Sequence, residues 1–194
     1  MNYYKLSHSV YDIVELIRKY DPAHQGLKLD LGCGYYKPSG FIGIDNLIGE
    51  ASQIKNEENI PDVFMDLNAE KIPFEDNTCM EIRASHFLEH SNLDHIFNEV
   101  WRLLKPQGIF QFTVPYANSA EGMYPGHLIF LTEKFFYENI NFQNRFVIVK
   151  EIYKESNDYK ALPENIKQLM PFDIARKFFF NVCNEMTMIA KPKK

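Results

Sequence analysis

The stretch that decides the fold is Leu27 to Asp45, LKLDLGCGYYKPSGFIGID. Two short apolar runs flank a turn that contains Gly32 and Gly34, and Asp45 closes the second run. Because glycine has no Cβ, the backbone of such a turn can pass close beneath a ligand. A carboxylate at the tip of the following strand can accept hydrogen bonds from both hydroxyls of a ribose. The order of strand, glycine turn, strand and acid therefore predicts a nucleotide site in an open α/β sheet.

The connection between the two predicted strands is short. Only Tyr35 to Gly40 separate the glycine turn from the second run, and Pro38 interrupts them. A crossover between parallel strands normally takes about a dozen residues or more, usually as a helix. We therefore expect the first crossover to be a loop or a single turn.

Downstream of this stretch, helical and strand patterns alternate. Apolar residues at helical spacing predict a helix that is capped by Ser7 or Ser9 and runs to about Tyr20. Further helices are expected over 93–104, 132–139 and parts of 161–180, and strands over 27–31, 41–44, 62–65, 79–84, 109–114, 146–153 and 184–190. We therefore expect an α/β fold: a Rossmann-like, doubly wound, mostly parallel sheet with helices on both faces and an antiparallel C-terminal edge strand.

The chain length favours a single domain. With 194 residues, one hydrophobic core is the simplest expectation. Within the domain 1–194 we expect an N-terminal helix in 1–24, a binding core over 27–115, and a substrate-side loop with the C-terminal strands over 116–194.

Composition limits the partners and the compartment. The formal net charge of −5 disfavours a nucleic-acid partner, because binding to phosphates requires a basic face. No apolar run approaches the roughly 20 residues of a membrane helix, and the first residues are too polar for a signal peptide. The cysteines Cys33, Cys79 and Cys183 are scattered, without zinc or disulfide spacing. We therefore expect a cytoplasmic protein without nucleic-acid or membrane partners, and leave the oligomeric state open.

Three ordered blocks of sequence carry a family resemblance. They are DLGCG (30–34) with GID (43–45), DL (66–67) with IPFEDN (72–77), and ASHFLEH (84–90) with EVWRLLKPQG (99–108). In this order the chain resembles the class I S-adenosylmethionine-dependent methyltransferases, of the type 11-like kind. It departs from the commoner pattern, because Tyr36 stands where a third glycine is usual. The short connection Tyr35–Phe41 is similar to that of a subgroup with a shortened first crossover.

The resemblance implies S-adenosylmethionine as the cofactor. It assigns cofactor binding to Asp30, Gly32, Cys33, Gly34, Asp45, Asp66, Leu67 and Ser85. In this assignment Asp30 accepts from the amino group, Asp45 from the ribose hydroxyls and Asp66 from the adenine amine. The backbone of the glycine turn, including the Cys33 amide, would lie against the methionyl part and the ribose.

The resemblance also implies in-line SN2 transfer of a methyl group. The sulfonium is already electrophilic, so the protein mainly aligns and desolvates the reactants. His127 follows the fifth expected strand and is the best candidate base, if the acceptor must lose a proton. We expect the acceptor to contact His86, Tyr116, Glu121 and Tyr124. A small molecule, such as a sugar or another metabolite, is the expected acceptor.

Three other functions compete with this interpretation. The chain could be a noncatalytic module that only binds S-adenosylmethionine. A nicotinamide dehydrogenase would require a third glycine after Gly34, which the chain lacks. The segment His86 to His90 reads H-x-x-E-H, a zinc peptidase pattern in which Glu89 would act as the base. Since no further ligand stands out and the methyltransferase pattern explains the segment, we expect no metal.

Overall fold

The described part of the chain forms one seven-stranded sheet with helices. The structure, a computed structural model, describes residues 10–46 and 61–194, so the expected caps Ser7 and Ser9 lie outside it. Its strands are β1 (Leu27–Leu31), β2 (Ile42–Asp45), β3 (Val63–Phe64), β4 (Cys79–Ser85), β5 (Leu104–Pro115), β6 (Phe146–Glu155) and β7 (Cys183–Pro192). Its helices are α1 (Val10–Tyr20), α2 (Leu93–Leu103), α3 (Glu133–Glu138), α4 (Ile140–Arg145), α5 (Asn157–Lys160), α6 (Glu164–Leu169) and α7 (Phe172–Phe178), with a 3-10 turn at Leu88–His90.

The sheet confirms the predicted mostly parallel α/β fold with antiparallel pairing near the C-terminus, but the last strand, β7, lies between β5 and β6, so β6 forms the edge. The strand order is β3-β2-β1-β4-β5-β7-β6. Strands β1 to β5 pair in parallel, whereas β7 is antiparallel to both β5 and β6. The strand order along the sheet changes direction between β1 and β4. Because β1 to β4 run parallel, their carboxyl ends meet at one edge. Ligands bind at this kind of edge in open α/β sheets.

Strand β5 begins earlier than the sequence pattern predicts. Helix α2 ends at Leu103, close to the predicted end at 104, but the strand starts at Leu104 rather than at Ile109. Leu104 pairs with Cys79 and Ile109 with Glu81, so the residues between them bulge out of register. Pro106 and Gly108, which are typical of turns, therefore lie inside the first part of the strand.

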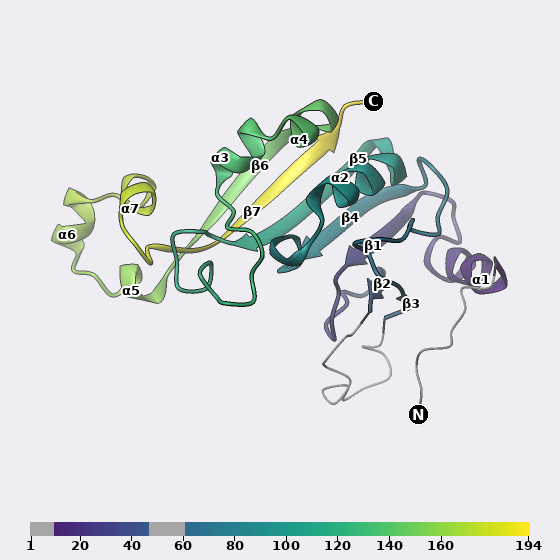
Figure 1. Ribbon diagram of the computed structural model, residues 1–194, viewed down its shortest axis with the longest axis horizontal. Coiled ribbons are helices and arrows are strands. Elements are labelled where there is room, and N and C mark those ends of the chain that lie inside the picture. The colour runs from purple at the N-terminus through teal and green to yellow at the C-terminus, as the bar shows by residue number, and fades with distance from the viewer. Residues whose placement is uncertain (1–9, 47–60) are drawn as a thin grey trace.

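A layer of phenylalanine rings joins the sheet to three helices. Figure 1 shows α2, α3 and α4 together on one face of the sheet. Under them, the ring of Phe112 on β5 lies 4.8 Å from that of Phe136 on α3. Phe97 on α2 lies 5.2 Å from Phe142 on α4, between ring centroids. These rings are fully buried, so part of the high aromatic content belongs to the core.

The end of helix α1 and the first crossover meet at Asp62. Residues 35–40 form a loop without a helix, as predicted. Lys37 donates to Asp62 at 2.6 Å, and the hydroxyl of Tyr20, the last residue of α1, donates to the same carboxylate at 2.8 Å. The Lys37 stem lies 2.9 Å from where a Cβ on Gly43 would stand. Because the first crossover contains no helix, the Lys37–Asp62 salt bridge is what fastens residues 35–40 to the sheet.

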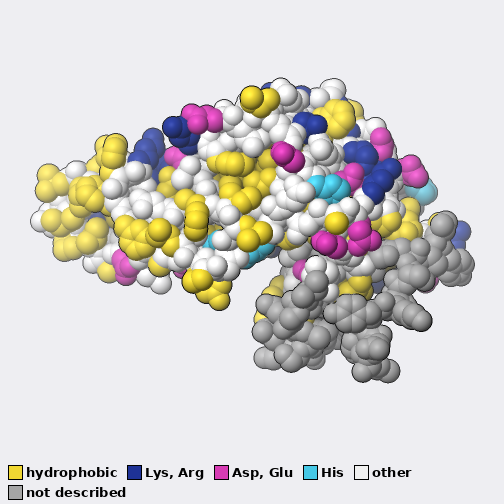
Figure 2. Space-filling model, in the orientation of Figure 1, with side chains coloured by type: hydrophobic (Ala, Val, Ile, Leu, Met, Phe, Trp, Pro, Cys, Tyr) yellow, Lys and Arg dark blue, Asp and Glu magenta, His cyan; other side chains and the backbone are white. Residues whose placement is uncertain are grey.

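The segment between β6 and β7 extends beyond the sheet and carries exposed apolar side chains. Figure 2 shows hydrophobic side chains gathered over α5, α6 and α7 at one end of the molecule. Leu169, Ile174, Phe178 and Phe180 are all more than half exposed. Within the described residues, no helix combines the length and apolar character needed to cross a bilayer.

Candidate functional site

The glycine turn after β1 is folded against the end of β2. Gly32 and Gly34 have positive φ angles of 63° and 52°. The amide of Gly32 donates to the carbonyl of Ile44 at 2.9 Å, and the amide of Gly34 donates to the Asp45 carboxylate at 2.8 Å. A Cβ on Gly32 would stand 2.3 Å from the ring of Phe87. Glycine at this position is therefore required by both the backbone conformation and the space.

A cavity of about 450 Å³ opens at the carboxyl ends of β1 to β4. Its lining contains Gly32, Gly34, Asp45, Asn46, Met65, Asp66, Leu67, Asn68, His86, Phe87 and His90. Ligand sites typically occupy roughly 300–1,000 Å³, so this one has room for a nucleotide-sized molecule. The sequence predicted six of these residues and missed Asn46, Met65, Asn68, Phe87 and His90. Asn46, Met65, Asn68 and Phe87 each adjoin a predicted residue, so strand-end position was the available signal for these four, whereas His90 lies in the 3-10 turn that follows.

Asp66 and Asn68, which follow β3, line the cavity and are held in place by hydrogen bonds. The amide of Asp66 donates to the Glu70 carboxylate at 2.7 Å, and the amide of Asn68 donates to the Asp66 carboxylate at 2.9 Å. The Asn68 side chain accepts from the amide of Asn92, which caps α2. These bonds hold the Asp66 carboxylate at the cavity edge.

Asp30 lies beneath the glycine turn and is buried. Its carboxylate is 3 % exposed and lies 3.6 Å from the guanidinium of Arg83. Burial raises the pKa of Asp30 to about 6; Arg83 opposes this shift and the Asp45 charge adds to it. Asp30 is therefore a carboxylate whose charge is costly to keep, next to a ligand-sized cavity.

Three residues expected to bind the cofactor, Asp30, Cys33 and Ser85, do not line the cavity. The Cys33 thiol is buried, points to the carbonyl of Gly34 at 3.6 Å, and has a pKa raised by burial. Ser85 ends β4 beside Thr113 of β5. Their expected contacts with a cofactor remain predictions.

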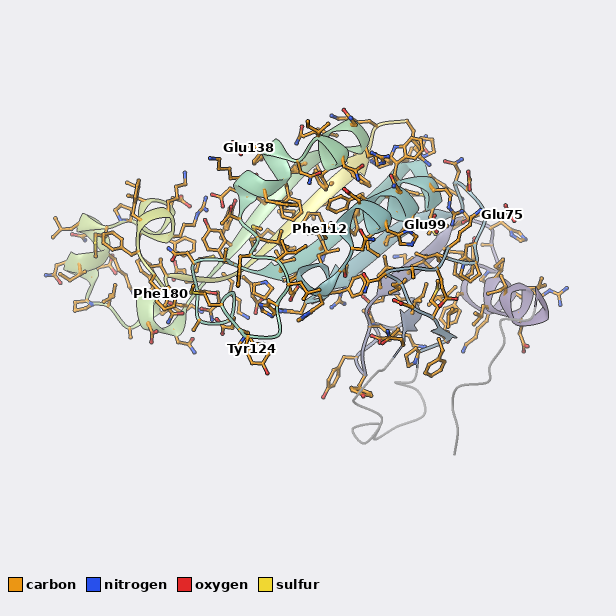
Figure 3. All side chains as sticks on the ribbon, in the orientation of Figure 1. Glu75, Glu99, Phe112, Tyr124, Glu138 and Phe180 are labelled. Carbon is orange, nitrogen blue, oxygen red and sulfur yellow. The ribbon has the colours of Figure 1, made fainter. Side chains whose placement is uncertain are left out.

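The structure separates the residues expected at the acceptor. His86 lines the cavity. Tyr116 is buried; its hydroxyl donates to Glu133 at 2.8 Å and accepts from Arg176 at 3.2 Å, and burial raises its pKa. Tyr124 is 63 % exposed, at the outer turn of the loop after β5 (Figure 3). Tyr116 and Tyr124 therefore do not gather at the cavity with His86.

Two other residues of this group lie in the same loop. The Glu121 carboxylate accepts from the side chain of Asn184 at 3.3 Å. The Nδ1 atom of His127 lies 3.0 Å from the carbonyl of Gly122. His127 also packs edge-on against His90, with 4.9 Å between ring centroids. His127 therefore contacts His90, which lines the cavity, but His127 does not itself line it.

The H-x-x-E-H segment does not form a peptidase helix. His86 has a positive φ of 52° and precedes the 3-10 turn Leu88–His90. The zinc peptidase pattern needs two histidines on one face of a helix, and this segment has no such helix. The alternative of a zinc peptidase of that type is therefore wrong.

Comparisons with known proteins agree with the sheet topology. A family described as "Methyltransferase domain" matches residues 29–112. An uncharacterized protein of Methanocaldococcus jannaschii, MJ1252, is 39 % identical over 92 residues, which are 44 % of this chain and 36 % of that protein. The chain thus matches only about a third of the length of that curated relative.

Solved structures show the same fold at low sequence identity. A SAM-dependent methyltransferase from Archaeoglobus fulgidus superposes with a TM-score of 0.62 and 16 % identity, covering 94 % of both chains. Coclaurine N-methyltransferase, solved with N-methylheliamine and SAH, gives a TM-score of 0.52 and 12 % identity over 93 % of this chain and 72 % of that one.

These likenesses agree with the sequence blocks. Residues 29–112 match a methyltransferase domain, and the sequence blocks that carry this likeness imply S-adenosylmethionine as its cofactor. The cavity fits this group, because it offers a glycine turn without Cβ atoms, a carboxylate at Asp45, and apolar side chains at Met65, Leu67 and Phe87.

Proposed function

We propose that this chain, built on a class I S-adenosylmethionine-dependent methyltransferase domain, transfers a methyl group to a small-molecule acceptor such as a sugar or another metabolite. The observation that carries this proposal is the cavity in which the glycine turn, Asp45 and Asp66 come together at the carboxyl edge of the sheet. When bound, S-adenosylmethionine supplies an electrophilic methyl group on its sulfonium. The chain then has to orient the two reactants and exclude water.

The cofactor side is assigned to the strand ends. Asp45, held by the Gly34 amide at 2.8 Å, would accept from the ribose hydroxyls. Asp66, held at the cavity edge by the Asn68 amide, would accept from the adenine amine. Asp30 would accept from the amino group, which as a cation would lower the cost of its buried charge. Gly32, Cys33, Leu67 and Ser85 complete this assignment, the first three through their backbone.

The acceptor side is assigned to the end of the cavity that His86 and His90 line. His86 would contact the acceptor, and His127, packed on His90, is the candidate base if the acceptor is a hydroxyl. Glu121 lies in the same loop as His127 and would contact an acceptor that extends past the histidines. Tyr116 and Tyr124 are not part of this proposal, since the first is buried and the second lies on the outside of the loop.

Charge and cysteines support the remaining expectations. The net charge of −5 favours a small molecule over a nucleic acid as the acceptor. All three cysteines are free and buried, which supports a reducing compartment, and we place the protein in the cytoplasm.

Calorimetry with S-adenosylmethionine and S-adenosylhomocysteine tests the cofactor site. We expect both to bind, and Asp45→Asn to weaken binding at least tenfold, since a charged acceptor would be lost at about 1.5–3 kcal/mol. Glu75→Gln removes one exposed negative charge outside the cavity lining (Figure 3) and is the matched control. An absence of heat with either ligand would overturn the proposal.

Turnover is tested by release of S-adenosylhomocysteine in the presence of mixed small-molecule acceptors. We expect release to depend on an acceptor and to fall in Asp45→Asn. Binding without turnover on sugars, phenols, amines and carboxylic acids would favour the noncatalytic module instead.

A further inference from the structure

Three side chains with metal-binding atoms meet beside the cofactor cavity. Glu89 and His90 belong to the 3-10 turn after β4, and His127 comes from the loop after β5. Each offers one ligand atom, and these atoms all lie within 4.8 Å of one another. His90 also lines the cavity, so the cluster borders the acceptor end. The loop is fastened there, because the carbonyl of Glu89 accepts from the amides of Leu128 and Ile129 at 2.9 and 3.2 Å.

The Glu89 carboxylate is buried without a hydrogen bond. Its side chain is 2 % exposed, and neither oxygen has a hydrogen-bond partner among the described residues. The nearest charged or chargeable group is His86, whose Nδ1 lies 3.7 Å from Glu89 Oε1. A buried polar atom is normally paired, because leaving it unpaired costs about 1–3 kcal/mol or more. No hydrogen-bond donor among the described residues therefore satisfies the Glu89 carboxylate.

Each of the two imidazole rings has its Nδ1 atom beside a backbone carbonyl. Nδ1 of His90 lies 3.0 Å from the carbonyl of Gly126, and Nδ1 of His127 lies 3.0 Å from the carbonyl of Gly122. Because a carbonyl only accepts, both Nδ1 atoms must carry the proton. In the neutral rings Nε2 then keeps its lone pair. Histidines that bind metals usually donate their other N–H to such a carbonyl or carboxylate, which fixes the tautomer.

We propose that Glu89, His90 and His127 bind one divalent transition-metal ion of the zinc type. Two imidazoles and one carboxylate are a known protein ligand set for zinc, with a fourth position left open. In tetrahedral coordination, neighbouring ligand atoms lie roughly 3.4 Å apart, so the side chains must close on the ion. His90 is exposed and His127 is half-buried, which leaves room for that movement and for an outside ligand. The ion supplies the partner that Glu89 lacks.

The ligand that this ion would take follows from its place. Its open position would lie at the acceptor end of the cavity, where an oxygen or nitrogen atom of a small molecule could bind. A bound zinc-type ion lowers the pKa of an oxygen ligand by several units, so the proton can leave to solvent water before the oxygen attacks. His127 would then act as a metal ligand instead of as the base. This role rests on the proposed function, whereas the metal site itself does not.

Cobalt binding tests the site without any cofactor or acceptor. The full chain is stripped with a chelator and titrated with Co²⁺, and then with Zn²⁺ to displace it. We expect one Co²⁺ per chain, with visible absorption bands of low coordination number. His90→Ala and His127→Ala should each weaken binding at least ~10-fold, the loss seen when even an outer-shell partner of a metal site is removed.

Two further variants keep the result interpretable. Glu89→Gln preserves the size of the buried side chain, so loss of Co²⁺ with an unchanged melting temperature assigns Glu89 as a ligand. His24→Asn removes a histidine elsewhere at a positive φ that Asn tolerates, and should leave binding unchanged. Co²⁺ binding that is absent, or equal in all variants, would overturn the site. Calorimetry with S-adenosylmethionine on the same samples reports separately on the proposed function.

Discussion

The amide of Gly34 donates a 2.8 Å hydrogen bond to the carboxylate of Asp45. The turn after β1 and the tip of β2 are therefore one unit, and the orientation of the acid depends on the backbone of the glycine turn. A ligand that uses Asp45 meets a carboxylate already held in place, which reduces the entropy lost on binding. Changes in the turn should thus affect the cofactor site even where they touch no ligand.

Gly32→Ala should damage both stability and cofactor binding. The new Cβ would stand 2.3 Å from the ring of Phe87, which lines the cavity, at a φ of 63°. We expect a loss of about 2–4 kcal/mol, from positive-φ strain plus overpacking, measured by urea unfolding. Gly40→Ala is the control, since its φ is 82° but nothing lies within 4 Å of its Cβ. Equal losses in the two variants would show that strain alone, and not Phe87, explains the effect.

Asp30→Asn should stabilise the chain above pH 6. The pKa of Asp30 is raised from 3.8 to about 6, so the folded state binds the proton more tightly than the unfolded state. Its contribution to stability is therefore present below about pH 4 and is lost as pH rises through about 6. The shift corresponds to at most about 3 kcal/mol at pH 8, reduced by the lost attraction to Arg83.

The measurement is the free energy of unfolding between pH 4 and 8. Wild-type stability should contain a downward slope with pH that Asp30→Asn lacks. The same variant should bind S-adenosylmethionine more weakly, because the amino group would lose a charged acceptor. A variant that is less stable than wild type at pH 8 would contradict the assigned direction of the pKa shift.

Much of the cavity lining was predictable because it lies in contiguous sequence. Gly32, Gly34 and Asp45 sit within one short stretch, and the carboxyl ends of parallel strands must meet at one edge. Asp66, in a separate block, was placed at the cavity by the same rule. Boundaries were less predictable: Pro106 and Gly108 indicated a loop, yet they form a bulge in β5, because pairing with β4 resumes on both sides.

The acceptor side depends on contacts that sequence order does not encode. His127 meets His90 because backbone bonds to Glu89 fasten the loop there. Tyr116 was expected to face a ligand, but its ring is buried and its hydroxyl is taken up by Glu133 and Arg176. Such pairings depend on how a long loop packs, for which periodicity and capping patterns give no signal.

Arg102→Lys should destabilise the chain although it lies outside the cavity. The guanidinium donates to the Glu99 carboxylate at 2.8 Å and to the carbonyls of Ile72 and Phe74 at 2.9 and 2.8 Å. An ammonium cannot reproduce this fork of donors. We expect a loss of about 2–3 kcal/mol in urea unfolding, because Glu99 is buried and would be left poorly paired.

The control for Arg102 is an exposed ion pair. Lys134→Ala removes a partner of Glu138 on α3, where both side chains are more than half exposed. Its effect should stay within about 0.5 kcal/mol. If Arg102→Lys lowered the free energy of unfolding by equally little, Arg102 would not be what holds residues 72–77 against residues 99–108.

Arg176→Leu should loosen the α5–α7 segment from the rest of the protein. The guanidinium is buried, donates to Glu133 at 2.7 Å, and stacks 3.7 Å from the ring centroid of Tyr153. It therefore connects α7 to α3 and to β6. Leucine fills the space but leaves the Glu133 carboxylate with one donor fewer, whose loss costs about 1.5–3 kcal/mol. We expect faster limited proteolysis within 157–180. The affinity for S-adenosylmethionine should change less than twofold, because the cavity lies at the carboxyl ends of β1 to β4.

Lys177→Leu changes the neighbouring exposed cation and should leave the proteolysis rate unchanged. If both variants are cleaved at the wild-type rate, the Arg176 contacts do not hold the segment in place.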